Sequence, residues 1–184
     1  PGQGARQEDE GDAEAEEAAE DCEADAERYR ALRLQALHDH PQFFGSDHVS
    51  SAAHPLEYWQ ERMRRSAGDE HGITYLAEGD DALVGMTTLV CDADDPKDRH
   101  TGLIVGVYVA PAWRGLGIAG PLLEHCIAWA QQLALRQIKL AVTTSNTAAI
   151  RCYARHGFRV YGIDPEAIGH GGRYYDELLM FKRL

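Results

Sequence analysis

The chain has 184 residues, 44% of them hydrophobic, which suits one globular domain and is too short for two ordinary ones. Most of its net charge of −12 lies in residues 1–27, which hold twelve acidic residues and one basic residue, so residues 28–184 are close to neutral. A near-neutral body excludes the basic surface that nucleic acid requires. No apolar run approaches the roughly 18 residues that span a bilayer, so we expect neither a nucleic-acid nor a membrane partner.

The acidic start of the chain, residues 1–24, consists largely of Gly, Ala, Glu and Asp. It has too few large apolar residues to offset the entropy of ordering it, so we expect a poorly ordered tail or extension there. The start lacks a basic and then apolar leader, and the four cysteines are scattered without a paired spacing. Both features favour a cytoplasmic protein with free thiols, folded over residues 25–184.

The first half of the predicted domain holds two helices and then a strand hairpin. A helical spacing of apolar residues begins near Ala24, and Pro55 is expected to start a second helix as its first residue. The runs 73–77 and 83–90 are typical of strands, and the Gly/Asp-rich stretch between them suits a hairpin turn. These two strands should pair antiparallel.

The second half alternates strands with helices. The expected strands cover residues 103–109, 138–142, 158–161 and 173–183. One expected helix runs from a glycine-rich turn to about residue 135, and the other covers 147–156. This order predicts an α+β fold built around one mixed sheet.

The glycine-rich turn at residues 114–120 joins a strand to a helix. Glycines at 115, 117 and 120 allow a tight turn, and the positive end of the helix dipole suits a pyrophosphate, beside the charge of Arg114. Two alternatives remain. One is a turn without a ligand. The other is a dinucleotide-binding G-x-G-x-x-G motif, although the next strand lacks the acidic residue that motif requires.

Two stretches of the chain resemble the GNAT family of N-acetyltransferases. The family's first signature is Arg or Gln, two residues, Gly, one residue, then Gly or Ala, and it is filled by Arg114, Gly117 and Ala119. A second, independent stretch follows in the correct order. Its matching residues are Asn146, Ala149, Tyr153, Gly157 and Phe158. The segments that begin at Arg33, His40 and Gly172 are similar to a bacterial branch of the same family.

The resemblance implies a single-domain fold with a central mixed, mostly antiparallel sheet flanked by helices. Acetyl-coenzyme A is expected where two strands splay apart, with no metal. The cofactor-binding residues that the resemblance implies are Val107, Val109, Arg114, Gly115, Leu116, Gly117, Ile118, Ala119, Gly120 and Asn146. Asn146 also suits a helix N-cap, and capping alone is an equal alternative.

Tyr153 is the catalytic residue that the resemblance implies. Its phenol, with an ordinary pKa near ~10, matches a departing thiolate and suits a general acid. The alternative is a buried aromatic that only packs. The base stays open among Tyr108, His100, Asp176 and Glu177.

The implied reaction is direct transfer of an acetyl group to a primary amine of a small molecule or a protein. Two alternatives are a catalytically silent acyl-coenzyme A sensor or subunit and a protein N-terminal acetyltransferase; a homodimer is compatible with each. The histidines at 38, 40, 48 and 54 fit no usual metal site. The chain departs from the family at its start. No strand-like run precedes Ala24, so the family's first strand is expected to be missing or replaced.

Overall fold

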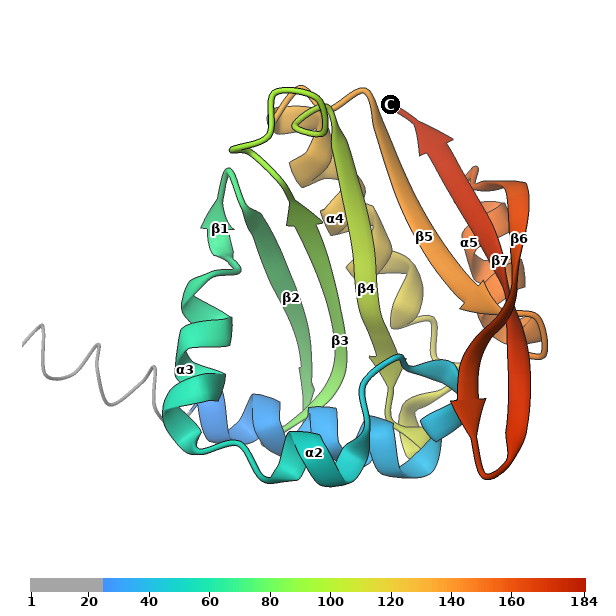
Figure 1. Ribbon diagram of the computed structural model, residues 1–184. Coiled ribbons are helices and arrows are strands. Elements are labelled where there is room, and N and C mark those ends of the chain that lie inside the picture. Colours follow the sequence, from blue (N-terminus) through green and yellow to red (C-terminus); the bar gives the residue numbers. More distant parts are fainter. Residues whose placement is uncertain (1–24) are drawn as a thin grey trace, which may run out of the picture.

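A seven-stranded mixed sheet organises residues 25–184, the part of the chain that this computed structural model describes (Figure 1). The strands lie in the order β1-β2-β3-β4-β5-β7-β6. Every neighbouring pair is antiparallel except β4 and β5, which are parallel. The α+β fold class is confirmed. The expectation of a poorly ordered tail over residues 1–24 lies outside the described residues.

The helices and strands follow the expected order with additions. A first helix covers residues 25–39 of the described range. The later helical elements are η1 (Pro41–Phe43), α2 (His48–Ala52), α3 (Leu56–Arg64), η2 (Pro111–Trp113), α4 (Ala119–Gln132) and α5 (Thr147–Arg155). The strands are β1 (Ala67–Asp69), β2 (Gly72–Gly79), β3 (Ala82–Cys91), β4 (Thr101–Val109), β5 (Gln137–Thr143), β6 (Arg159–His170) and β7 (Arg173–Arg183).

Helices cover both faces of the sheet, and each face has its own apolar core. The first helix and α3 pack on the front face in the view of Figure 1, where Tyr29, Leu32 and Trp59 meet Met86 and Tyr108. Helices α4 and α5 lie behind the sheet, and this larger core is centred on Leu123, Cys126, Ile138, Leu140 and Met180. The two cores fix the sheet between two layers of helices.

Strands β4 and β5 pair at one end only. Their register runs from Thr101 opposite Gln137 to Leu103 opposite Lys139, whereas β4 continues to Val109 and β5 to Thr143. A register shift between Met86 and Thr88 on β3 marks a bulge in β4 near Gly106, whose φ is +67°. Figure 1 shows the two strands diverging below their paired end. The splay that the resemblance implies is therefore present between β4 and β5.

Several elements differ from the sequence-based expectation. Strand β6 is expected only over 158–161 but runs to His170, because two register shifts against β7 hide its alternation. The short elements α2 and β1 were not expected. Pro55 is the N-cap of α3 rather than its first residue, and α4 ends at Gln132 instead of near residue 135.

The edge of the sheet beside β2 is formed by β1, a three-residue strand that follows α3. In the described part of the chain, this edge strand therefore comes after the first helix and not before it. No helix within residues 25–184 is both long enough and apolar enough to cross a membrane.

Candidate active site

The turn between η2 and α4 is open, and its backbone adopts a conformation that favours glycine at two positions. Gly115 has φ +80° and Gly117 has φ +82°, a region that other residues rarely adopt. A Cβ at either position would meet no atom of residues 25–184 within 4 Å. The glycines are therefore required by the backbone conformation, and the space beside them is free. Leu116 between them is 67% exposed.

The N–H groups of this turn have no hydrogen-bond partner among the described residues. Ile118 is the N-cap of α4 and makes no side-chain cap bond, and Ala119 and Gly120 are the first two residues of the helix. Across residues 25–184, no backbone hydrogen bond uses the N–H of any residue from 115 to 120. A helix start leaves such donors unpaired, and the helix dipole adds partial positive charge. Six consecutive donors at a helix N-terminus form a site that suits phosphate oxygens.

Arg114 braces the end of β4 against this turn. Its Nε donates to the carbonyl oxygen of Val109 at 2.9 Å, and its Nη2 lies 2.7 Å from Nε2 of His40. Burial and the positive charge of Arg114 lower the pKa of His40, which favours the neutral imidazole, whose Nε2 can accept. The guanidinium also lies 5.7 Å from the centre of the Tyr108 ring. Arg114 is exposed and adds positive charge beside the free N–H groups.

The free edge of β4 faces the opening toward β5. The N–H of Ala110 donates to Val84 on β3 at 2.8 Å. Since the hydrogen-bonding direction alternates along a strand, the N–H and C=O of Val109 point to the β5 side, and the same direction recurs at Val107. The Val109 carbonyl oxygen accepts from Arg114, whereas the Val109 N–H stays open toward the gap between β4 and β5.

Asn146 precedes α5 as its N-cap and Tyr153 lies within the helix, in different surroundings. The side-chain oxygen of Asn146 accepts from the N–H of Ala149 at 3.2 Å, so Asn146 caps the helix as its sequence position indicates. Tyr153 is only 6% exposed and packs edge-on against Phe158, with the ring centres 6.0 Å apart. Burial raises the pKa of Tyr153. The phenol therefore keeps its proton and remains a proton donor.

The four candidates for the general base lie in different surroundings. His100 lies just before β4 begins, at the paired end of β4 and β5 and not at the splay. The Tyr108 hydroxyl donates to Asp39 at 3.2 Å, and burial together with Asp39 raises the pKa of Tyr108 to about 12. Asp176 already accepts the N–H of Glu166 at 2.9 Å.

Glu177 remains as the available carboxylate. It is half-buried on β7, directly opposite Thr143 at the end of β5, and so lies beside the splay. Burial raises the pKa of Glu177, and the negative charge of Asp164 raises it further.

The burial of one charged side chain, that of Arg33, was not predicted from the sequence. Arg33 lies on the first helix between the buried residues Leu32 and Ala36, and it is only 7% exposed. The sequence signal was available, because Arg33 falls on the apolar face of a helix where a solvated arginine is out of place.

Comparisons with known proteins decide the family. The model of the Acetyltransferase (GNAT) family matches residues 34–158, which is more than half of the chain. The chain belongs to the GNAT family of acetyltransferases. It is therefore an acetyltransferase, as the two sequence stretches indicated.

Curated relatives of this GNAT chain are named as acetyltransferases. L-amino acid N-acetyltransferase AaaT of Escherichia coli (strain K12) is 28% identical over 165 residues, which cover 85% of this chain and 93% of that protein. A mycothiol acetyltransferase of Thermobispora bispora is 31% identical over 141 residues, 76% of this chain. The match covers 45% of that second relative, so the chain spans less than half of its length.

Solved structures share the fold. A GNAT-family acetyltransferase from Streptococcus pneumoniae superposes with a TM-score of 0.78 at 26% identity, covering 88% of this chain and 95% of that one. The yncA protein of Salmonella typhimurium, solved with acetyl-CoA, gives a TM-score of 0.72 at 22% identity over 88% of this chain and 90% of that one. This second likeness shows the fold alone. GNAT neighbours thus include proteins solved with acetyl-CoA.

Proposed function

We propose that this GNAT acetyltransferase transfers the acetyl group of acetyl-CoA to a primary amine of a small molecule or a protein by direct attack. The observation that carries the proposal is the row of free N–H groups from Gly115 to Gly120 beside a splayed strand pair. Relatives named for L-amino acids and for mycothiol support a small-molecule acceptor. The catalytic domain is proposed to be residues 25–184.

The residues present fit the cofactor. The free N–H groups at 115–120 and the guanidinium of Arg114 are proposed to hold the pyrophosphate. The backbone edge at Val107 and Val109 is left unpaired by β5 and would hydrogen-bond the pantetheine arm. Asn146 is proposed to contact the cofactor from the start of α5 with the amide nitrogen that its capping bond leaves unused.

The chemistry is shared between the cofactor and three protein groups. Acetyl-CoA supplies an activated thioester when it is bound. The open N–H of Val109 is proposed to stabilise the oxyanion that develops on the carbonyl. Tyr153 would donate its proton to the departing thiolate, and Glu177 would accept the proton of the acceptor ammonium, directly or through a water. No covalent enzyme intermediate is required, and none of residues 25–184 form a group of three or more potential metal ligands.

Thiol release tests this proposal. Purified protein, acetyl-CoA and a broad amine panel should give amine-dependent release of free coenzyme A, with the acetylated amine identified by mass spectrometry. Calorimetry should show acetyl-CoA binding without an amine. Tight binding with no release across the panel would instead support the silent sensor, and absence of binding would remove the proposed cofactor site.

A further inference from the structure

The first helix carries a buried guanidinium, that of Arg33, for which residues 25–184 supply no anionic partner. Arg33 is 7% exposed, its Nη2 makes only a long bond of 3.4 Å to Oγ of Ser46, and its guanidinium lies 4.9 Å from the centre of the Phe44 ring. Its Nη1 is buried, and no group in the described part of the chain forms a hydrogen bond with it. No acidic side chain among residues 25–184 forms an ion pair with Arg33.

Such a charge is costly unless a ligand balances it. An unpaired ion in a protein interior costs several kcal/mol even after relaxation, and arginine does not escape by losing its proton. Burial lowers the pKa of Arg33, and the positive charge of Arg62 lowers it further. Both effects disfavour the cation in the free protein. Both would be relieved by an anion placed against Nη1.

The free Nη1 lies against the bulge of β4. A Cβ built on Gly106 would come within 3.4 Å of this atom. Gly106 directly precedes Val107, and the proposed cofactor arm runs from the turn back along β4 past Val109 and Val107. Arg33 therefore lies on the front face of the sheet at the reactive end of that arm, where an acceptor amine has to arrive.

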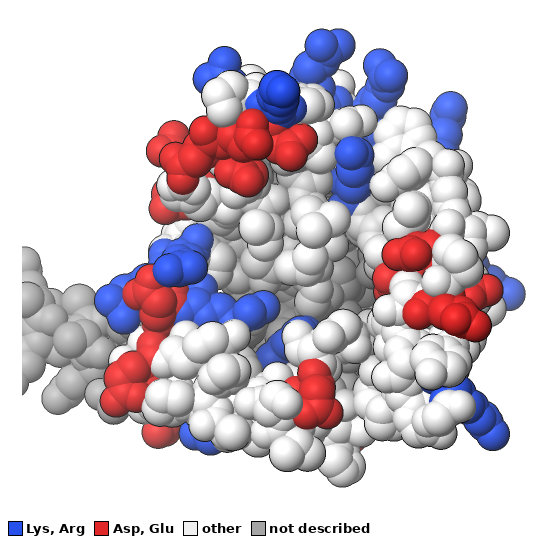
Figure 2. All heavy atoms as spheres, in the orientation of Figure 1, with Lys and Arg blue, Asp and Glu red and all other residues white. Residues whose placement is uncertain are grey.

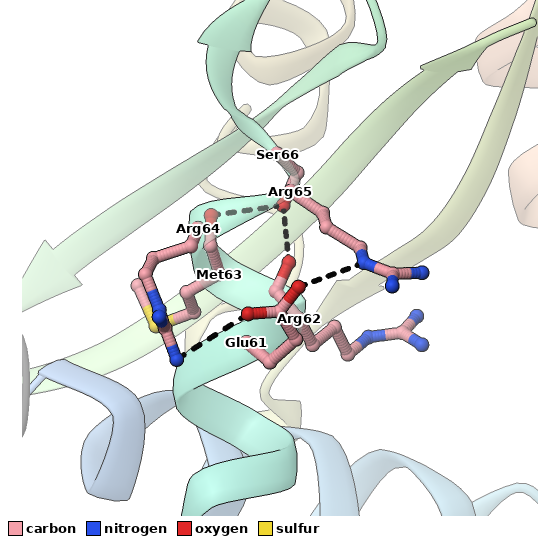
Figure 3. A network of polar contacts seen from close by, with 6 residues as sticks. All are labelled: Glu61, Arg62, Met63, Arg64, Arg65 and Ser66. Carbon is pink, nitrogen blue, oxygen red and sulfur yellow. Dashed lines mark hydrogen bonds and ion pairs between the residues drawn. The ribbon is translucent and has the colours of Figure 1, made fainter.

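A second arginine lies at the same corner and lines an open cavity. Nε of Arg62 donates to the Tyr29 hydroxyl at 3.1 Å. In Figure 3 the ion pairs of Glu61 go to Arg64 and Arg65, while the Arg62 guanidinium points away from Glu61. Arg62 also lines a cavity of about 790 Å³ between α3 and β3. Figure 2 shows the front of the molecule hollowed, with basic side chains reaching into the hollow from one wall.

We propose that Arg33 binds a carboxylate carried by the acceptor, so that the amine acetylated belongs to a small amino acid and not to a simple amine. The assignment rests on the proposed function. A carboxylate matches the donor geometry of a guanidinium, and in an α-amino acid a single carbon separates it from the amine. The carboxylate is held by Nη1 of Arg33 beside the bulge, and the side chain of the acceptor extends past Arg62 into the cavity.

Matched acceptor pairs test the assignment. Each pair is an L-amino acid and the amine that lacks only its carboxylate, with the amino acid amide as a neutral third member. The wild-type protein should prefer the acid by tenfold or more in kcat/KM. Arg33→Gln should remove about 10- to 100-fold of that preference, chiefly through KM, as expected for loss of a hydrogen bond to a charged group. Arg33→Lys keeps the charge and should restore part of it.

Matched controls separate binding from folding. Arg28→Gln removes an arginine of the same first helix that pairs with Asp25 at 3.2 Å and does not line the cavity, and it should leave the preference unchanged. Acetyl-CoA affinity by calorimetry should be equal in all variants. Because Arg33→Gln removes an unbalanced buried charge, it should melt at or above the wild-type temperature. A lower melting temperature with unchanged selectivity would assign Arg33 a structural role and overturn the proposal.

A binding measurement keeps the assignment testable without turnover. In the presence of coenzyme A, an N-acetyl amino acid should bind to wild type at least tenfold more tightly than its neutral amide. Arg33→Gln should bind the acid and the amide with equal affinity. Equal use of acids and amines by an active wild type would overturn the carboxylate site while leaving the acetyltransferase intact. Preference for aminoalkylphosphonates over the acids would overturn the choice of carboxylate. No thiol release with any amine would instead count against the proposed function.

Discussion

Ile104 and Tyr108 stand four residues apart on β4, yet their side chains enter opposite cores of the protein. Side chains alternate along a strand, so residues four apart ordinarily share a face. The bulge near Gly106 shifts the alternation by one residue. It turns Tyr108 toward the first helix, while Ile104 stays packed against α4. The same bulge lies beyond Leu103, the last residue of β4 that pairs with β5, so the bulge and the splay occur at the same part of β4.

Replacing the bulge glycine should damage both stability and catalysis. Gly106→Ala puts a side chain at φ +67° and within 3.4 Å of Nη1 of Arg33. We expect a loss of about 1–3 kcal/mol in the free energy of unfolding, measured with urea, and a lower kcat/KM. Gly171→Ala is the strain-matched control, because Gly171 has φ +58° and open space around it. An equal loss of kcat/KM in both variants would contradict a special role for the bulge.

A methyl group on the phosphate turn should weaken cofactor binding. Gly117→Ala has room for its Cβ but not a favourable backbone, since φ is +82°. The turn should shift its N–H groups, and the Kd for acetyl-CoA measured by calorimetry should rise tenfold or more, the effect of about 1.4 kcal/mol. Gly172→Ala, with φ +73° and equally open surroundings, should bind acetyl-CoA as wild type does. Unchanged affinity in Gly117→Ala would mean that this turn does not hold the pyrophosphate.

The elements that carry the proposed cofactor site could be predicted from the sequence. The strand over 103–109, the turn and α4 follow each other with strong patterns, and Asn146 caps α5 as expected. These signals are local, because glycine positions, capping residues and apolar periodicity act within a few residues. The presence of Gly106 inside a strand pattern was also a usable sign of a bulge.

The remaining features depend on contacts between distant segments. Strand β6 contains Gly162, Pro165 and Gly169, which locally favour a loop, and only its pairing with β7 makes it a strand. The proposed role of Arg33 depends on where β4 passes the first helix, which no local pattern encodes. The choice of Glu177 among the base candidates likewise rests on its register with Thr143.

Removal of the Tyr153 hydroxyl should slow the chemical step and spare the fold. Tyr153→Phe keeps the packing on Phe158 and deletes a group whose pKa is raised by burial. We expect kcat to fall about 10²-fold, within the usual range for loss of a general acid, with unchanged Kd for acetyl-CoA and an unchanged melting temperature. Tyr161→Phe is the matched control, since Tyr161 is exposed on β6. Full activity in Tyr153→Phe would leave this tyrosine a packing residue.

Glu177 gives a pH dependence whose sign can be worked out. Burial and Asp164 raise the pKa of Glu177, and the base form is the ionised one. The wild-type kcat should therefore rise with pH through a value above the ordinary pKa of a glutamate, and Glu177→Gln should lack this limb and lose about 10²-fold in kcat. Asp164→Asn removes one cause of the shift, so the acid limb of this control should move to lower pH.

The same residue should affect stability in the opposite sense. A raised carboxyl pKa means that the folded state binds the proton more tightly than the unfolded chain does, so ionisation of Glu177 costs stability as pH rises. Glu177→Gln should match wild type at a pH below the unfolded pKa and exceed it in melting temperature above the folded pKa. Thermal melts across this pH range, beside the rate profiles, check both effects. An acid limb that persists unchanged in Glu177→Gln would assign the base to another group.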